Sequence, residues 1–177
     1  MWGRIKLAFI KFFLCFWLKY CYRRFSLINQ RVREKKYKEC PQKESWLVST
    51  VLNFYKSCEW VSDPLGGKWD YVSKPEKFYM TREGDCDDWS YFAVTMLIKD
   101  AHSLSVSWKE QSGKYNGHVV CVHKDTDGKF WHMGNWGLCG PFDNLDKVVE
   151  SILPQDATGL AVSLRDRRLK CVRCWKL

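Results

Sequence analysis

A chain of 177 residues suits one domain with a hydrophobic core of its own. Hydrophobic residues make up 46% of the sequence and ten residues are tryptophan, which excludes an intrinsically disordered protein. The formal net charge is +9, and residues 1–45 account for all of it, with twelve Lys and Arg against three Glu. The rest of the chain, tail included, has no net charge. We therefore predict a basic, aromatic N-terminal segment over residues 1–44, a domain over 45–165 and a basic C-terminal tail over 166–177.

The nine cysteines are odd in number and have no regular spacing. This pattern is not that of a disulfide framework, and it indicates a reducing compartment, so we expect cytoplasmic localisation. Cys171 and Cys174 form a C-x-x-C pair near the C-terminus. A zinc site needs a second pair of ligands, and a thioredoxin-type site needs a strand before the pair and a helix after it. Neither is visible, which disfavours a metal or redox role for this pair.

The N-terminal segment is apolar and aromatic over residues 2–22, but Lys and Arg interrupt it. Its longest uncharged run, Phe12 to Leu18, is far shorter than the roughly 20 residues of a membrane-spanning helix. We expect a helix that lies in a membrane interface, with Arg31 to Lys38 adding attraction to anionic lipid. An ordinary helix packed on the domain is the alternative. Nucleic acid binding through residues 23–43 is disfavoured because no recognition motif supports it.

Helical patterns dominate the first half of the domain. Apolar residues at helical spacing predict a helix over residues 44–60, and Pro75 marks the start of another that reaches about Thr81. A loop is expected over 62–67 and a short extended piece over 69–72. Gly84 then breaks the chain before a helix with an apolar stripe begins at Cys86.

Alternating apolar residues dominate the second half and predict antiparallel strands. Asp125 to Gly128 is a strong tight-turn signal between two of these strands. Helices first and antiparallel strands later indicate an α+β fold. The predicted elements are strands over 104–108, 117–123 and 129–135, a loop over 137–141, a helix over 145–153 and a last strand over 160–164.

Cys86 is the residue whose surroundings most suggest chemistry. Unpaired N–H groups and partial positive charge at a helix N-terminus stabilise a thiolate and an adjacent oxyanion. Asp85, Asp87 and Asp88 oppose thiolate formation, so a reactive Cys86 needs a further partner, typically a histidine. A buried cysteine acting as a small hydrophobe is the alternative, but three neighbouring acids favour solvent.

The predicted hairpin supplies a candidate histidine. If residues 126–127 form the loop, His118 faces Asn135 across the two strands and shares a side of the sheet with Val120. A glycine bulge at Gly128 would shift this register by one residue. We expect that side of the sheet to pack against the Cys86 helix. The alternative is that His118 is structural and Asn135 is a turn residue.

The order Gly84-Asp85-Cys86-Asp87-Asp88, a helix, Gly117-His118-Val119-Val120 and a hairpin that returns to Asn135 resembles the transglutaminase-like cysteine protease superfamily. Within that superfamily it resembles the bacterial transglutaminase-like cysteine proteinases. The resemblance covers about residues 45–153. It implies a papain-like α+β fold in which N-terminal helices, with the catalytic cysteine at a helix N-terminus, pack on an antiparallel sheet.

The resemblance also assigns roles to residues. Cys86 takes the place of the nucleophile, His118 that of the general acid/base and Asn135 that of the residue that orients the imidazole. The family usually has Asp in this third place, and an amide keeps the hydrogen bond but not the charge. Asp143 is the rival third member, because some relatives carry their acid in an Asp-Asn-Leu sequence.

A cysteine-dependent hydrolase is the function that this resemblance implies. It would cleave a peptide, isopeptide or glutamine-type amide bond of a protein or peptide through a thioester acyl-enzyme. The alternatives are a protein-glutamine acyltransferase that crosslinks its substrates, and a catalytically idle binding or scaffold domain anchored by the basic N-terminal helix. No cofactor is required, although some relatives bind calcium with acids that correspond to Asp85 and Asp87.

Overall fold

The computed structural model describes residues 34–63, 71–98 and 100–176. The predicted interfacial helix over residues 2–22 lies outside the described residues, as do Trp69 and Asp70 of the predicted extended piece. Among the residues that are described, no helix combines the length and hydropathy needed to cross a membrane.

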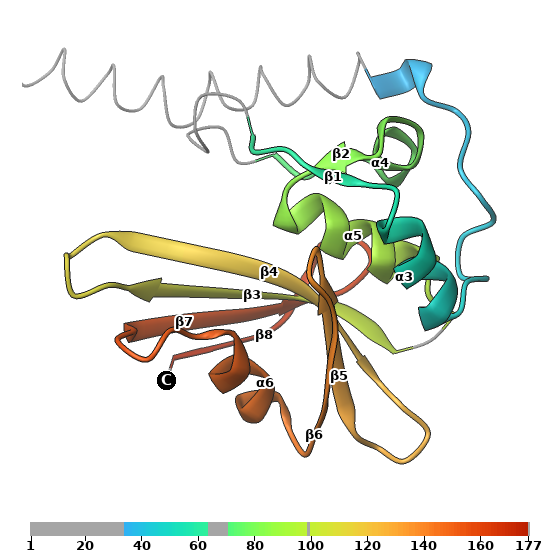
Figure 1. Ribbon diagram of the computed structural model, residues 1–177. Coiled ribbons are helices and arrows are strands. Elements are labelled where there is room, and N and C mark those ends of the chain that lie inside the picture. The colour runs from blue at the N-terminus through green and yellow to red at the C-terminus, as the bar shows by residue number, and fades with distance from the viewer. Residues whose placement is uncertain (1–33, 64–70, 99, 177) are drawn as a thin grey trace, which may run out of the picture.

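One six-stranded antiparallel sheet forms the centre of the molecule, with the strand order β6-β5-β4-β3-β7-β8 (Figure 1). A separate parallel pair, β1 (Glu59–Trp60) and β2 (Glu83–Gly84), lies before it in the chain. The predicted α+β class is confirmed. The strands of the large sheet are β3 (Ala101–Lys109), β4 (Tyr115–Lys124), β5 (Phe130–Gly134), β6 (Gly137–Phe142), β7 (Thr158–Arg165) and β8 (Cys171–Lys176).

Helices cover both faces of this sheet. Three of them gather on one side, α3 (Val48–Tyr55), α4 (Pro75–Thr81) and α5 (Cys86–Met96), and α6 (Leu145–Ile152) lies on the other (Figure 1). The bounds of α4 follow from local signals, since Pro75 is pre-organised for the first helical position and Arg82 ends the helix in a left-handed conformation.

The first core fixes α5 against the sheet. Phe78 and Phe92 are fully buried, and Cys121 of β4 joins them from the sheet side. The Tyr55 hydroxyl donates a hydrogen bond to the Trp89 carbonyl at 2.5 Å, which ties α3 to α5. Each large apolar side chain buried here contributes about 1.5–3 kcal/mol. The N-terminal end of α5 is therefore held on a rigid base.

The second core lies on the opposite face, between the sheet and α6. Asn144 caps α6 by accepting the Lys147 N–H at 3.0 Å, and the apolar face of the helix then meets the sheet. The buried members of this core are Leu104, Val106, Val120, Val122, Val148, Val149, Val162 and Leu164.

Three element predictions are wrong. The helix predicted over 44–60 spans only Val48–Tyr55, because Glu44 has a positive φ of 62° and Trp46 forms a bridge with Leu97. The glycines and proline of residues 137–141 suggested a loop, but these residues form β6 at the edge of the sheet. The predicted tail over 166–177 contains β8, which pairs with β7 and extends the sheet.

Candidate active site

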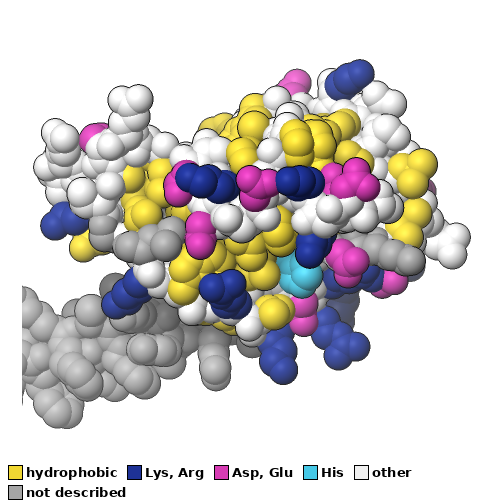
Figure 2. All heavy atoms as spheres, turned by 90° about the horizontal axis from the view of Figure 1, so that it is seen from below, with side chains coloured by type: hydrophobic (Ala, Val, Ile, Leu, Met, Phe, Trp, Pro, Cys, Tyr) yellow, Lys and Arg dark blue, Asp and Glu magenta, His cyan; other side chains and the backbone are white. Residues whose placement is uncertain are grey.

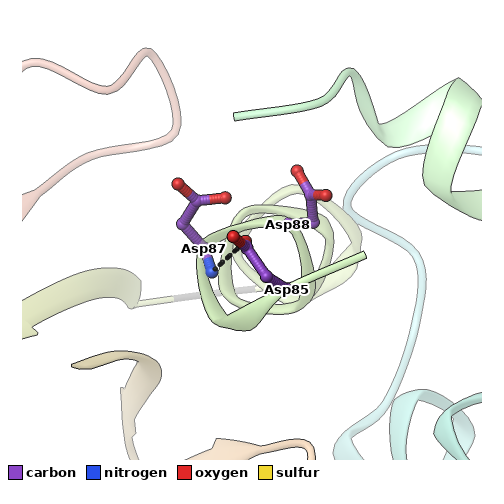
Figure 3. Close-up of side chains that lie close together, drawn as sticks. All are labelled: Asp85, Asp87 and Asp88. Atoms are coloured by element: carbon purple, nitrogen blue, oxygen red, sulfur yellow. Dashed lines mark hydrogen bonds between the residues drawn. The ribbon is translucent and has the colours of Figure 1, made fainter. Parts of the chain in front are cut away.

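Cys86 is the first residue of α5 and is half-buried. Asp85 caps the helix, because its carboxylate accepts the Asp87 N–H at 3.3 Å while its carbonyl accepts the Trp89 N–H at 3.1 Å. Figure 3 shows this cap at the start of the helix. The predicted helix start at Cys86 is confirmed, and with it the helix-terminus field that favours a thiolate.

Gly84 permits the tight approach to this helix. A Cβ at Gly84 would lie 2.6 Å from the Asp88 Cβ and 2.9 Å from the Phe78 ring. The Trp89 indole also donates a hydrogen bond to the Gly84 carbonyl at 3.0 Å. Glycine is required here by the close approach of α4 and α5, whatever the chemistry of Cys86.

Asp88 is almost fully buried, at 4% exposure, and accepts the Ser73 N–H at 2.5 Å. Burial raises the pKa of Asp88 from its ordinary 3.8 to about 7, against the opposing effect of the Ser73 N–H. The Asp85 carboxylate adds to the increase. Asp88 therefore has a structural role, in which it joins the start of α5 to the chain that precedes α4.

The three acids around Cys86 form a cluster that bears on the calcium prediction. Oxygens of Asp85, Asp87 and Asp88 lie within 4.8 Å of one another (Figure 3). Calcium takes about six to eight oxygen ligands, so three carboxylates supply part of such a set. Asp85 and Asp88 each also accept a backbone N–H. Carboxylate oxygens are ligands that suit the predicted calcium ion. Asp88 lies in the same cluster as the predicted ligands Asp85 and Asp87.

His118 lies on β4 opposite Val106 of β3. Its Nε2 is buried and has no hydrogen-bond partner among the described residues. Burial lowers the pKa of His118, and the Asp85 carboxylate acts in the opposite direction. The residue next to Cys86 is thus within electrostatic range of the imidazole. The Nε2 atom of His118 can therefore form a hydrogen bond with a ligand that binds at this site.

The predicted pairing of His118 with Asn135 is wrong by one residue. β4 and β5 pair with Cys121 opposite Met133 and His123 opposite Trp131, and the same register continued places Trp136 opposite His118. The cause is the turn after Asp125, which includes Gly128 at a φ of +80° and closes with Lys129. A glycine there lengthens the loop and shifts every cross-strand partner.

The prediction that the His118 side of β4 packs against α5 is also wrong in part. Val120 and Val122, which share that side by alternation, lie in the second core with α6, and Cys121 points to α5 instead. The β5 ladder begins only at Cys121, so β4 pairs with β3 alone around His118. The connection between His118 and α5 that the structure does give is electrostatic, since the Asp85 carboxylate at the start of α5 raises the pKa of His118 against the effect of burial.

Trp136, for which the sequence predicted no role, covers His118. The two rings lie 4.5 Å apart between centroids with an interplanar angle of 31°. The indole is half-exposed and also meets the ring of the buried His132 edge-on at 6.1 Å. Trp136 occupies the β5–β6 turn, which reaches toward α5 in Figure 1. The one sequence signal for it was its position next to the predicted Asn135.

The two candidates for a third catalytic member lie at opposite ends of the β5–β6 hairpin. Asn135 is exposed in the two-residue turn between Gly134 and Gly137. Asp143 follows β6 at the far end of the β5–β6 hairpin, where its exposed carboxylate forms an ion pair with Lys129. The structure brings neither side chain into a described hydrogen bond with the imidazole. Asp85 is the acid whose charge acts on His118.

The other described cysteines differ from Cys86 in their surroundings. Burial raises the pKa of Cys40 and of Cys58 to about 11, and raises that of the fully buried Cys121 further. Cys139 is exposed on β6. Cys171 and Cys174 form a disulfide within β8, so the expectation of reduced thiols does not hold for this pair. Cys86, by contrast, is the first residue of α5, beside three carboxylates.

No family model and no curated protein matches this chain. Among solved structures, it is similar to LapG of Legionella pneumophila in its calcium-bound form, at 17% sequence identity with a TM-score of 0.41. A second LapG structure shows 13% identity and a TM-score of 0.44, and an EGTA-treated one 16% and 0.40. The matches cover 72%, 71% and 66% of this chain, which spans 62%, 68% and 63% of the respective LapG chains.

Proposed function

We propose that the protein is a cysteine-dependent hydrolase of peptide, isopeptide or glutamine-type amide bonds. The observation that carries the proposal is the combination of three structural features. A cysteine stands at a helix N-terminus, its neighbour Asp85 acts electrostatically on His118, and the buried Nε2 of His118 has no partner among the described residues. The resemblance of the Gly84–Asp88 sequence to the nucleophile region of transglutaminase-like proteases supports the same reaction.

In this mechanism the Cys86 thiolate attacks the substrate carbonyl carbon, and the carbonyl π electrons move onto oxygen. The Cys86 backbone N–H, at the first position of α5, donates to that oxyanion. The His118 imidazolium gives its proton to the leaving amine as the C–N bond breaks, which leaves a thioester. His118 then takes a proton from the water that hydrolyses the thioester, and Cys86 is released.

Asp85 has the role of the charged partner in this proposal. Its carboxylate favours the imidazolium form of His118, which the burial of the ring disfavours. An Asn135 side chain on an exposed turn and an Asp143 side chain paired with Lys129 supply no such charge at the ring. We therefore assign to Asp85 the negative charge that stabilises the His118 imidazolium. Asn135 and Asp143 remain the alternatives for the residue that forms a hydrogen bond with the imidazole when substrate binds.

Calcium belongs to the proposal as a structural ion. Asp85 and Asp87, together with Asp88, would hold it and relieve the mutual repulsion of three carboxylates at the start of α5. Added calcium should then raise the melting temperature of the protein, and Asp87→Asn should remove the increase. An equal increase in the variant would contradict this part of the proposal.

The partner of the site would be a protein or a peptide. We also propose, from the sequence alone, a cytoplasmic protein whose residues 2–38 associate with an anionic membrane surface.

Hydrolysis of a mixed peptide pool tests the proposed function. New amino termini should form with the wild-type protein, and Cys86→Ala should abolish them, while Cys139→Ala, the matched change at an exposed thiol, should leave the rate unchanged. Products linked to an added amine, in place of hydrolysis, would favour the acyltransferase. No Cys86-dependent product of either kind would favour the idle scaffold domain.

A further inference from the structure

A cavity of about 530 Å³ lies where the first described residues meet α4 and α5. Its volume is in the range of small-molecule sites, which measure about 300–1,000 Å³. Its charged lining consists of four lysines and one glutamate, contributed by Lys35, Lys38, Lys43, Lys74 and Glu76. We call this cavity the lysine pocket.

The lysine pocket has a surplus of positive charge. Glu76 is engaged by Lys43, with 2.7 Å between the Oε1 and Nζ atoms. Lys35, Lys38 and Lys74 form no ion pair with any residue in the described part of the chain. Three ammonium groups around one hollow repel one another, and an anion bound between them would remove that repulsion.

The walls of the lysine pocket are held in place by buried contacts. The 3₁₀ turn η2 (Glu34–Lys36) contains Glu34, which is only 2% exposed. The Glu34 carboxylate accepts a hydrogen bond from the Tyr71 hydroxyl at 2.6 Å and lies 3.8 Å from the Lys77 Nζ of α4. This buried acid fixes Lys35 and the residues after it against the start of α4, so the lysines converge on one side of the molecule.

On another part of the surface the charges are mixed. On the face shown in Figure 2, Lys and Arg side chains alternate with Asp and Glu along a row across the molecule. Alternating charges neutralise one another locally and attract no particular anion. The lysine pocket differs because its one acid is already paired.

We propose that the lysine pocket binds a phosphate monoester group, carried by a soluble compound or by a lipid headgroup. Lysine binds phosphate as a point charge, and a doubly charged phosphate matches three unpaired ammonium groups better than a single carboxylate does. The site is separate from Cys86 and His118, so it binds its ligand whether or not the chain is an enzyme.

Titration of the full chain with inorganic phosphate, followed by NMR, tests the soluble source. The double variant Lys35→Gln/Lys38→Gln should bind phosphate about tenfold more weakly, since each exposed ion pair contributes up to about 1 kcal/mol. The control Lys114→Gln/Lys170→Gln removes the same charge at exposed turns and should bind as the wild type does. Glu76→Gln should bind more tightly, because Lys43 loses its partner.

Phosphatidylcholine vesicles with and without phosphatidic acid test the lipid source. Binding that needs phosphatidic acid and that falls in Lys35→Gln/Lys38→Gln, but not in the control, assigns the pocket to a lipid headgroup. The proposal is overturned if neither probe binds, if both double variants lose binding equally, or if Glu76→Gln weakens it. Cys86→Ala should bind either probe normally, which keeps this result independent of the proposed function.

Discussion

At the scale of single residues, Asp85 has two separate effects at the candidate site. Its carboxylate caps α5 directly before Cys86, and its charge raises the pKa of His118 against the effect of burial. A helix cap needs only an oxygen acceptor, whereas the effect on His118 needs a negative charge. The two properties can therefore be separated by one substitution.

Asp85→Asn should keep the helix cap and lower the pKa of His118, because asparagine caps a helix as well as aspartate but carries no charge. An NMR titration of the histidine ring protons measures this change. Asp125→Asn is the matched control, since Asp125 acts on His123 and not on His118. An unchanged His118 pKa in Asp85→Asn would remove Asp85 from the proposed mechanism.

Trp136 contributes the burial that lowers the His118 pKa. Trp136→Ala should admit water to the imidazole and raise its pKa toward the ordinary value, because the indole lies on the ring at 4.5 Å. The control is Trp60→Ala, a tryptophan of similar exposure on β1. If both variants leave the His118 titration unchanged, the indole does not determine the environment of the ring.

At the scale of elements, the start of α5 depends on packing against α4. Gly84→Ala should lower the free energy of unfolding by about 1–3 kcal/mol, the usual cost of overpacking, because its Cβ would overlap Asp88 and Phe78. Urea unfolding measures the loss. Ser49→Ala on the exposed side of α3 should stay within about 0.5 kcal/mol. A Gly84→Ala protein as stable as this control would show that α4 and α5 do not meet as described.

Asp88 should make the stability of this region fall as pH rises. Its pKa is about 7 in the folded state and 3.8 ordinarily, so the folded state holds a proton between these values that the unfolded state has lost. The free energy of unfolding should therefore decrease from about pH 4 to pH 7. Asp88→Asn, which keeps an acceptor for the Ser73 N–H, should flatten this dependence in urea unfolding. The same slope in both proteins would contradict the assignment.

The elements with local signals were predictable from the sequence. Pro75 predicted the start of α4, and the Gly84 break with the apolar stripe predicted that of α5. Cross-strand register was not predictable, because the conformation of Gly128 decides it and both turn lengths fit the residue types. The edge strands β6 and β8 were missed because edge positions tolerate glycine, proline and charge, which are also loop signals.

At the scale of the whole molecule, the residues of the candidate site come from both halves of the fold. The helical side supplies Asp85 and Cys86, and the sheet supplies His118 on β4 and Trp136 on the β5–β6 turn. Residue type and spacing predict Cys86 and His118 as the reacting pair. The contact of Trp136 with His118 was not predictable, because it depends on the register of β4 and β5, and the effect of Asp85 on His118 depends on tertiary packing.

The rate of alkylation of each cysteine by iodoacetamide tests the central claim most directly, because only a thiolate reacts and only Cys86 has a proposed imidazole partner. Peptide mapping at mildly acidic pH should show Cys86 labelled faster than the exposed Cys139, and His118→Asn should remove that advantage while Cys139 reacts as before. Equal rates at Cys86 and Cys139 in the wild type, or a Cys86 rate unaffected by His118→Asn, would contradict the proposed thiolate–imidazolium pair.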